Sequence, residues 1–253
     1  MPSLRGLLAA AALGLALAMP AQLAFAQALT GEQKTEIQGL IKSYLIEHPE
    51  VLNDALGALG KYREAQDSKE RAKAAGEVVA SPDGIVIGNP QGKVTLAEFF
   101  DYNCGYCRQA IPDMARLMKD NPDLRVMLFD FPILTPASVD AAIVAEAARR
   151  QLPGDKFWQY HSTLLGHKGL NDKEQALAVA KDMGLDMKQL EKDAADPSIR
   201  AKLEASDKYA KELKLNGTPS YVVGDDVQIG RAGYDQLQAE VNNVRKCGKA
   251  ACS

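Results

Sequence analysis

The feature that most constrains the fold is a pair of cysteines between an apolar strand and a helix. The segment "KVTLAEFF" at residues 93–100 is almost continuously apolar, as in strands buried on both faces of a sheet. The sequence "DYNCGYCRQAIP" follows at once and begins a helix that we expect to end near "DNP" at residues 120–122. With a strand predicted at residues 124–133, "LRVMLFDFPI", this order gives the crossover unit of an α/β protein.

The two cysteines are predicted to have different surroundings. Cys107, Ile111, Met114 and Met118 follow the helical period, which places Cys107 on the core side and leaves Cys104 at the exposed first turn. A sulfur at a helix N-terminus faces unpaired N–H groups and the positive end of the dipole, so we expect a lowered pKa for Cys104. Three residues along a helix separate Cα atoms by about 5 Å, which a disulfide tolerates. Attack by Cys104 and resolution by Cys107 are therefore geometrically available.

The Cys-x-x-Cys spacing also fits half of a zinc site or an inert disulfide. A tetrahedral zinc site would need Cys247 and Cys252 as its other ligands, and an oxidising compartment would convert both pairs to disulfides. The position after a strand and before a helix favours a redox pair. We therefore predict no metal and no cofactor. Cys247 and Cys252 enclose only "GKAA", which predicts a small structural disulfide at the tail.

The first 26 residues have the pattern of an export signal. Arg5 precedes a 13-residue apolar run, "LLAAAALGLALAM", and "AFA" at residues 24–26 supplies a cleavage pattern of small residues. We expect the mature chain to begin near Gln27. The net charge of −3 becomes −4 when Arg5 is removed, and this balance does not suggest binding to nucleic acid.

The N-terminal part of the mature chain, residues 27–76, is predicted to be a helical segment with a linker. Two short apolar stripes are followed by the charged sequence "KYREAQDSKERAKAAG", which predicts a solvated, semi-rigid linker. Stripes this small must pack on another surface, and we expect self-association through residues 34–60; docking on the chain's own main domain is the alternative. The stripes consist of Ile37, Leu40, Ile41, Tyr44 and Leu45, and of Leu52, Leu56 and Leu59.

The main domain is predicted at residues 77–253. Residues 136–215 show four or five helical segments and no convincing strand, with Gly184 and Gly217 as helix stops. The segment "PSYVVGDDVQIGRAG" predicts a hairpin around residues 224–226, and a closing helix should begin near Tyr234.

Several of these motifs together resemble a known family. The sequence "EFFDYNCGYC" with Pro112 is similar to the thioredoxin superfamily, in which a proline kinks the active-site helix. The long helical insertion, "KFWQYHSTLL" and "TPSYVV" resemble the DsbA-type exported oxidoreductases, and "IKSYLIEHPEVLNDAL" resembles their ScsC-like and Com1-like branch. This resemblance spans residues 34–246. It implies an α/β thioredoxin fold with a helical-domain insertion at about 136–215, an N-terminal helical extension, a periplasmic location and a trimer.

The resemblance also implies further site residues. Thr218 and Pro219 match the loop whose proline is cis and lies against the sulfurs, where the backbone of Thr218 can pair with an extended substrate peptide. Glu98 matches a partly buried carboxylate near the cysteines. It shares a strand face with apolar residues, so burial should raise its pKa and let it accept the proton of Cys107. An ion pair between Glu98 and a lysine is the alternative.

The predicted function is that of a thiol–disulfide oxidoreductase. At the positions of Gly105, Tyr106 and Thr218, the sequence resembles the bacterial disulfide isomerases and reductases more than the strong oxidase, which favours isomerase or reductase action. We also expect Gly105 and Tyr106 to contact substrate. The expected partners are exported proteins with disulfides and a membrane thiol reductase or oxidase that recharges the pair. The alternatives are a monomeric dithiol oxidase and a copper(I)-binding carrier that uses the same cysteines; Met114 and Met118 are expected in the core rather than on copper.

Overall fold

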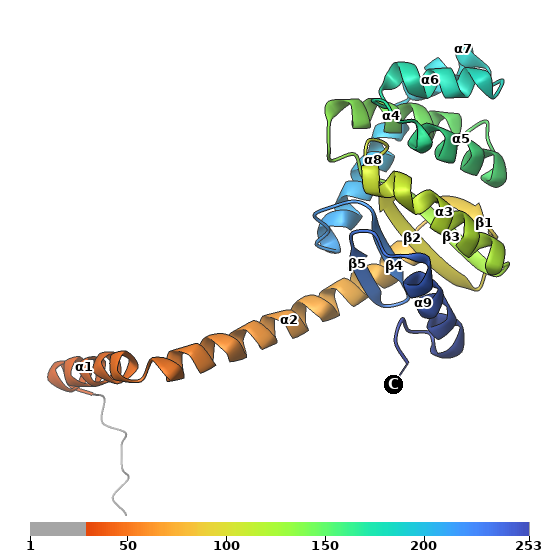
Figure 1. The fold of residues 1–253 in the computed structure, drawn as a ribbon. Coiled ribbons are helices and arrows are strands. Elements are labelled where there is room, and N and C mark those ends of the chain that lie inside the picture. Colours follow the sequence, from red (N-terminus) through yellow and green to blue (C-terminus); the bar gives the residue numbers. More distant parts are fainter. Residues whose placement is uncertain (1–28, 253) are drawn as a thin grey trace, which may run out of the picture. The chain divides into compact units, whose positions relative to one another are not determined.

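The computed structural model describes residues 29–252 and divides into two compact units between Leu59 and Gly60 (Figure 1). The expected signal peptide at residues 1–26, with its cleavage near Ala26, lies outside the described residues. The division falls earlier in the chain than the boundary predicted between residues 76 and 77.

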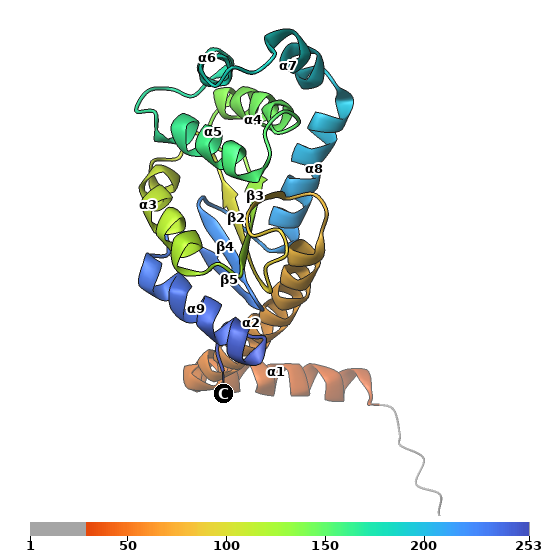
Figure 2. The same ribbon diagram turned by 90° about the vertical axis from the view of Figure 1, so that its right-hand side faces the viewer.

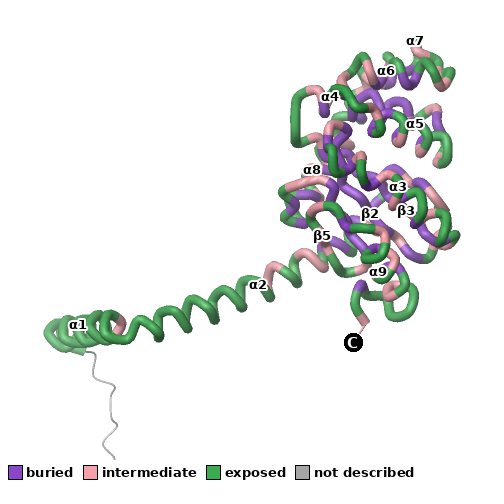
Figure 3. The backbone as a smooth tube through the Cα atoms, viewed as in Figure 1, coloured by how far each residue is buried: buried purple, intermediate pink, exposed green. Residues whose placement is uncertain are grey.

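The first unit contains helix α1 (Gly31–Glu47) and the beginning of α2 (Pro49–Ala80). Thr30 caps α1: its hydroxyl accepts from the Gln33 N–H at 3.3 Å, and the Gln33 side chain accepts from the Thr30 N–H at 3.0 Å. No residue of α1 is buried, as the exposed tube in Figure 3 shows. The exposed large apolar side chains of this unit are Leu29, Ile37, Leu40, Ile41, Tyr44, Ile46, Val51, Leu52, Leu56 and Leu59.

The charged segment predicted as a linker continues helix α2 as far as Ala80. The last turns of α2 bury Ala74, Ala75 and Val78 against the second unit, to which they belong. Ion pairs from Lys214 to Asp67 and Glu70 tie the middle of the helix to the same body. The second unit therefore begins at Gly60, directly before the predicted linker, and includes that linker, which explains the earlier boundary.

The second unit is built on a five-stranded sheet in the order β1-β3-β2-β4-β5. β2 and β3 are parallel, as the predicted crossover requires, and the other neighbours are antiparallel. The short strand β1 was not predicted, because four residues show too little periodicity. The strands are β1 (Ile85–Gly88), β2 (Val94–Phe100), β3 (Leu124–Asp130), β4 (Ser220–Val223) and β5 (Asp226–Ile229).

Helices cover both faces of this sheet (Figure 2). Helices α3 (Gly105–Asp120) and α9 (Tyr234–Cys247) pack on the face that carries Leu96 and Phe100, whereas the end of α2 and helix α8 (Pro197–Glu212) pack on the opposite face, which carries Phe99. Successive strand residues point to opposite faces, so a nearly continuous apolar strand is what burial on both sides needs. The predicted thioredoxin fold is confirmed.

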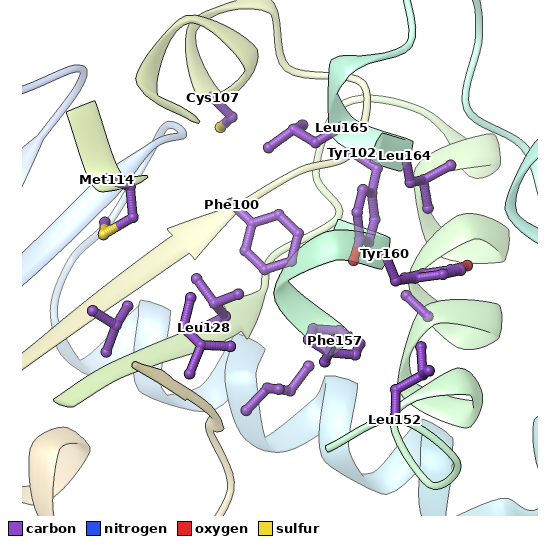
Figure 4. Packing of buried hydrophobic residues seen from close by; sticks show 14 of the residues in the cluster. Phe100, Tyr102, Cys107, Met114, Leu128, Leu152, Phe157, Tyr160, Leu164 and Leu165 are labelled. Atoms are coloured by element: carbon purple, nitrogen blue, oxygen red, sulfur yellow. The ribbon is translucent and has the colours of Figure 1, made fainter. Parts of the chain in front are cut away.

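The insertion between β3 and β4 contains five helices, as predicted. Figure 4 shows aromatic side chains where it meets the sheet: Phe100 and Tyr102 lie beside Tyr160 and Phe157 of the insertion. The Phe100 and Tyr102 rings meet edge to face with centroids 5.0 Å apart. The insertion consists of α4 (Pro136–Ala148), α5 (Gly154–Gly166), α6 (Lys173–Asp182), α7 (Met187–Ala194) and α8.

The predicted helix stop at Gly184 is confirmed by its φ of +77°, but the stop at Gly217 is wrong. Helix α8 ends earlier, at Glu212 with Leu213 as its C-cap, and the next residue, Lys214, has a φ of 57°. The Leu215 N–H donates to the Ala210 carbonyl at 2.8 Å. This turn brings the side chains of Leu213 and Leu215, on either side of Lys214, into the core beside α2. No helix within residues 29–252 is long and apolar enough to cross a membrane.

Candidate active site

Cys104 is the N-cap residue of α3, at the end of the sheet where β2 runs into the helix. Its sulfur accepts from the Cys107 N–H at 3.3 Å, and its thiol donates to the Thr218 carbonyl at 3.2 Å. The side chain is only 5% exposed, less than the exposed first turn predicted from the sequence, because the loop of Thr218 lies over it. A small nucleophile thus stands at a helix N-terminus with donors around it.

These donors make Cys104 acidic. Hydrogen bonds from the Cys107 side chain, from Thr218 and from the backbone N–H groups of Cys107 and Tyr106 outweigh partial burial and lower the pKa of Cys104 to about 6. The Thr218 hydroxyl has no partner among the described residues while Cys104 is a thiol, which leaves it available to the thiolate. At neutral pH the exchange-competent form of Cys104 therefore predominates.

Cys107 lies on the core side of α3, as predicted. It is 1% exposed and packs with Met114 in the cluster that joins α3 to the sheet, where Figure 4 shows it beside Leu165. Burial, the hydrogen bond to Cys104 and the charge of Glu98 all raise the pKa of Cys107. Both cysteines are free thiols in this structure. The Cys104 thiol is acidic, whereas the Cys107 thiol strongly resists ionisation.

The loop before β4 closes the site over the cysteines. The Thr218–Pro219 peptide bond is cis, as the resemblance implied. The Thr218 carbonyl, which belongs to this cis peptide bond, accepts the hydrogen bond from the Cys104 thiol. Gly105 and Tyr106, in the first turn of α3, are exposed beside the pair, and the Tyr106 side chain is 63% exposed.

Glu98 lies on β2 beneath the pair, on the face that α3 covers. It is 3% exposed, and burial together with the nearby charge of Cys104 raises its pKa to about 8. The ion pair with a lysine, left open by the sequence, does not form within residues 29–252. A carboxyl with this pKa can both hold and release a proton near neutral pH.

The sequence analysis missed Tyr221 as a neighbour of this carboxyl. Tyr221 stands directly opposite Glu98 in the β2–β4 register and is 1% exposed. Burial, followed by the charges of Glu98 and Cys107, raises its pKa, and its hydroxyl has no partner among the described residues. The only sequence signal for Tyr221 is its place two residues after Pro219 on a predicted strand, where alternate side chains share a face. That Tyr221 lies opposite Glu98 can be inferred only when the register of the two strands is known.

The other predicted residues lie apart from this site. Cys247 and Cys252 form a disulfide with an S–S distance of 2.09 Å at the end of α9, so their sulfurs are joined to each other. Met114 and Met118 pack in the core of α3. His161 is buried, contacts the Tyr102 hydroxyl at 3.3 Å, and has its pKa lowered to about 3 by burial, which fits a packed histidine.

An acidic N-cap cysteine, a buried second cysteine and a cis-proline loop on this sheet define a thioredoxin-fold dithiol protein. The family model described as DSBA-like thioredoxin domain matches residues 95–242. The chain therefore belongs to the DSBA-like thioredoxin family, a family of thiol–disulfide oxidoreductases. A second model, the copper resistance protein ScsC N-terminal domain, matches residues 33–66, in agreement with the predicted ScsC-like branch.

Two solved structures are similar over most of their own length. A thioredoxin-like oxidoreductase from Silicibacter pomeroyi DSS-3 is 40% identical, with a TM-score of 0.62, and the alignment covers 66% of this chain and 95% of that one. A linker-deletion mutant of ScsC from Proteus mirabilis is 25% identical, with a TM-score of 0.63, and covers 88% of this chain and 99% of that one.

Among curated proteins, the similarity extends to a domain of a much longer chain. The Na(+)/H(+) antiporter NhaA 1 of Salinispora arenicola is 28% identical over 168 residues, which are 66% of this chain and 26% of that protein. The chain thus spans about a quarter of the length of the first curated relatives that it matches.

Proposed function

We propose that this protein is a periplasmic thiol–disulfide oxidoreductase that acts chiefly as a disulfide isomerase or reductase on exported proteins. The observation that carries the proposal is the asymmetry of the cysteine pair. A pKa of about 6 makes Cys104 a thiolate at neutral pH, while burial keeps Cys107 protonated until it is needed. A low pKa at Cys104 also stabilises the reduced pair and makes the couple more oxidising, so the asymmetry supports disulfide exchange but does not set its direction.

In the first step the Cys104 thiolate attacks one sulfur of a substrate disulfide. The substrate S–S bond breaks, a Cys104–substrate disulfide forms, and the second substrate sulfur leaves as a thiolate. In isomerisation another substrate thiolate attacks the mixed disulfide, which restores the Cys104 thiolate with no net change in oxidation state. The enzyme then needs no external electrons.

In reduction Cys107 attacks the Cys104 sulfur instead. A Cys104–Cys107 disulfide forms, the bond between Cys104 and the substrate breaks, and the substrate sulfur that was bonded to Cys104 leaves as a thiolate. The proton that Cys107 loses passes to Glu98. The charge of Cys104 contributes to the raised pKa of Glu98, and that charge is absent from the mixed disulfide. Glu98 therefore ionises more readily at the moment when a base is required.

We propose that an extended substrate segment binds beside the pair. The backbone of Thr218 offers hydrogen bonds to such a segment, and exposed apolar side chains surround the opening. Tyr106, Leu134 and Leu170 are 63%, 50% and 56% exposed. Leu134 donates its N–H to Asp101, in the loop that carries Cys104, at 3.0 Å. An unfolded polypeptide with exposed apolar residues suits this surface.

The direction of the reaction is inferred from the N-terminal unit. Its exposed apolar stripes support self-association through residues 34–60, with a trimer as the state that the resemblance favours. An oligomer would present several Cys104 thiolates around one mispaired substrate and would shield them from an oxidase. A membrane thiol reductase would then return the Cys104–Cys107 disulfide to the dithiol form.

The test is reactivation of scrambled ribonuclease by the reduced enzyme. The wild-type protein should restore ribonuclease activity, Cys104→Ser should restore none, and Cys107→Ser should retain part of the isomerisation, which needs only the first cysteine. Alkylation of the pair directly in cell extracts, followed by mass measurement, tests the direction. Dithiol recovered from cells supports isomerase or reductase action, whereas fully oxidised pairs with a monomer in light scattering would establish the alternative dithiol oxidase.

Copper(I) binding is the second candidate function, because residues 33–66 match a domain described from a copper resistance protein. The reduced pair supplies two soft sulfur ligands, which copper(I) prefers. Titration of the dithiol protein with copper(I) against a competing chelator tests this function. Binding lost in Cys104→Ser, in a protein that leaves scrambled ribonuclease inactive, would favour the carrier over the enzyme.

A further inference from the structure

The chain segment immediately before Cys104 is bound to a loop of the helical insertion. Asn103 donates its side-chain amide to the Asn171 carbonyl at 2.8 Å and accepts from the Asn171 N–H at 2.8 Å. The Asn171 side chain in turn donates to the Tyr102 carbonyl at 2.6 Å. Three hydrogen bonds thus join residues 102–103 to Asn171, which follows α5 and lies 68 positions after Asn103 in the sequence.

This contact is buried and supported from several sides. Asn171 is 0% exposed, and its side-chain oxygen lies 3.2 Å from a ring nitrogen of His167. Asn103 donates a further hydrogen bond to the Ser138 hydroxyl in α4 at 3.1 Å. One turn into α3, Arg108 donates to the Leu165 carbonyl at the end of α5 at 2.9 Å. The insertion therefore holds the active-site segment both before and after Cys104.

The residues that directly follow Cys104 give it little support. A side-chain carbon added at Gly105 would meet nothing within 4 Å, and Tyr106 is exposed. The sulfur must nevertheless stay 3.3 Å from the Cys107 N–H and beside Thr218 for its donors to act. The direction in which the chain enters the helix has to be fixed by the preceding residues, because an N-cap side chain reaches its donors only from an extended backbone.

We propose that Asn103 and Asn171 are positioning residues that hold Cys104 in the geometry needed for thiol–disulfide exchange. The helical insertion thereby contributes directly to the reactivity of a cysteine that the sheet and α3 carry. This inference rests on the proposed role of Cys104 as the attacking sulfur. It predicts that loss of either asparagine side chain disturbs Cys104, because each makes its own hydrogen bonds between the insertion and residues 102–103.

The test is the pH dependence of Cys104 alkylation in the full reduced chain, followed by mass. In Asn103→Ala and Asn171→Ala the sulfur moves away from its donors, and the midpoint should rise by about one pH unit. Alkylation should then be about tenfold slower than wild type at pH 5 and equal to wild type at pH 9, where both proteins are fully ionised. The double variant should shift at least as far as the larger single shift, because Asn103→Ala removes the bonds to the Asn171 backbone and Asn171→Ala removes the separate bond to the Tyr102 carbonyl.

Asn89→Ala is the matched control. Asn89 also joins two loops through its side chain, donating to the Pro122 carbonyl at 2.8 Å and accepting from the Gln91 N–H at 2.9 Å, but it makes no contact with the cysteine pair. Asn89→Ala should lose about as much stability as Asn103→Ala, and its Cys104 alkylation should keep the wild-type pH dependence. Asn103→Gln keeps an uncharged amide that can both donate and accept, and it should recover part of the shift.

An unchanged midpoint in Asn103→Ala overturns the inference, whatever happens to stability. Asn103 is only partly buried, so this variant carries the test even if Asn171→Ala does not fold. A wild-type midpoint near that of a free thiol would instead contradict the proposed function, because Cys104 itself would not be activated. The two failures are therefore distinguishable in one experiment.

Discussion

Cys104 and Cys107 are chemically identical residues one helical turn apart, and their surroundings give them opposite roles. Cys104 collects donors at a helix end, whereas Cys107 is enclosed by apolar side chains above a buried carboxyl. The hydrogen bond from Cys107 to Cys104 is the largest contribution to the low pKa of Cys104. The two sulfurs therefore act as a coupled pair.

Replacement of Cys107 tests that coupling. In Cys107→Ala the thiol donor is lost, so the pKa of Cys104 should rise from about 6, but the remaining backbone donors should keep it below that of a free cysteine. Thiolate absorbance at 240 nm, followed against pH, measures the shift. If the midpoint stays at the wild-type value, the backbone donors alone activate Cys104.

Glu98→Gln should make stability less dependent on pH. The folded pKa of Glu98 is raised to about 8, so the folded chain holds a proton that the unfolded chain releases above its ordinary pKa of 4.5. Wild-type stability should therefore fall as pH rises from 4.5 to 8. At pH 9 the variant should be more stable than wild type by roughly 3–5 kcal/mol, and at pH 4 the two should be similar.

Urea unfolding of the reduced proteins at pH 4, 7 and 9 gives this comparison. Glu204→Gln, at an exposed position of α8, is the control and should follow the wild type at each pH. Equal stability of Glu98→Gln and wild type at pH 9 would show that burial of Glu98 is not costly.

At the level of elements, one end of the β4–β5 hairpin lies at the cysteine pair and the other end lies at the C-terminal disulfide. β4 runs antiparallel to β2, with Ser220 opposite Phe99 and Val223 opposite Leu96. The residue before Ser220 is the cis-proline, at the end of β2 that leads to Cys104. The Gly224 turn lies at the other end, against Val244 and the tail that the Cys247–Cys252 disulfide closes.

Removal of that disulfide should affect stability and not chemistry. In the Cys247→Ser, Cys252→Ser double variant, the loss of a short closed loop should lower the free energy of unfolding by about 2 kcal/mol. The alkylation midpoint of Cys104 should remain at about 6, because the disulfide lies at the opposite end of the sheet. Chemical unfolding and alkylation of the same samples check both statements. A changed midpoint would indicate that the tail acts on the active site.

The elements with strong periodicity could be predicted from the sequence, and the contacts between distant segments could not. Apolar strands and the stripe through Cys107 and Met114 placed the crossover and the cysteines correctly. The helical character of residues 34–75 can be predicted from the sequence, but the charge of residues 61–76 indicates solvation, so the packing of the end of α2 on the second unit is not predicted. Glu98 could be found from the resemblance, and its place on an apolar strand face predicted a raised pKa. Tyr221 and Asn171 meet the site only through register and packing.

For the whole molecule, the N-terminal unit leaves apolar side chains exposed that a stable monomer would bury. Leu40 and Leu56 are 63% and 58% exposed, and they belong to the two stripes of α1 and α2. Isolated helices with such stripes gain most of their stability from packing on a partner. We therefore expect activity on mispaired substrates to depend on assembly through residues 34–60.

Polar substitution of the stripes tests this link. Leu40→Gln with Leu56→Gln should convert an oligomer to a monomer in light scattering and reduce reactivation of scrambled ribonuclease, while the Cys104 midpoint stays unchanged. Glu36→Gln with Asp54→Asn, exposed on the same helices, is the control pair. A wild-type protein that is monomeric at micromolar concentration would contradict self-association.

Trapping the mixed disulfide tests most directly whether Cys104 is the attacking thiol. Cys107→Ala, mixed with a disulfide-containing substrate, should accumulate a covalent adduct whose peptide map places the substrate on Cys104. Cys104→Ala should form no adduct, because the remaining sulfur is buried and protonated. An adduct through Cys107, or no adduct in either variant, would contradict the assignment of Cys104 as the attacking thiol.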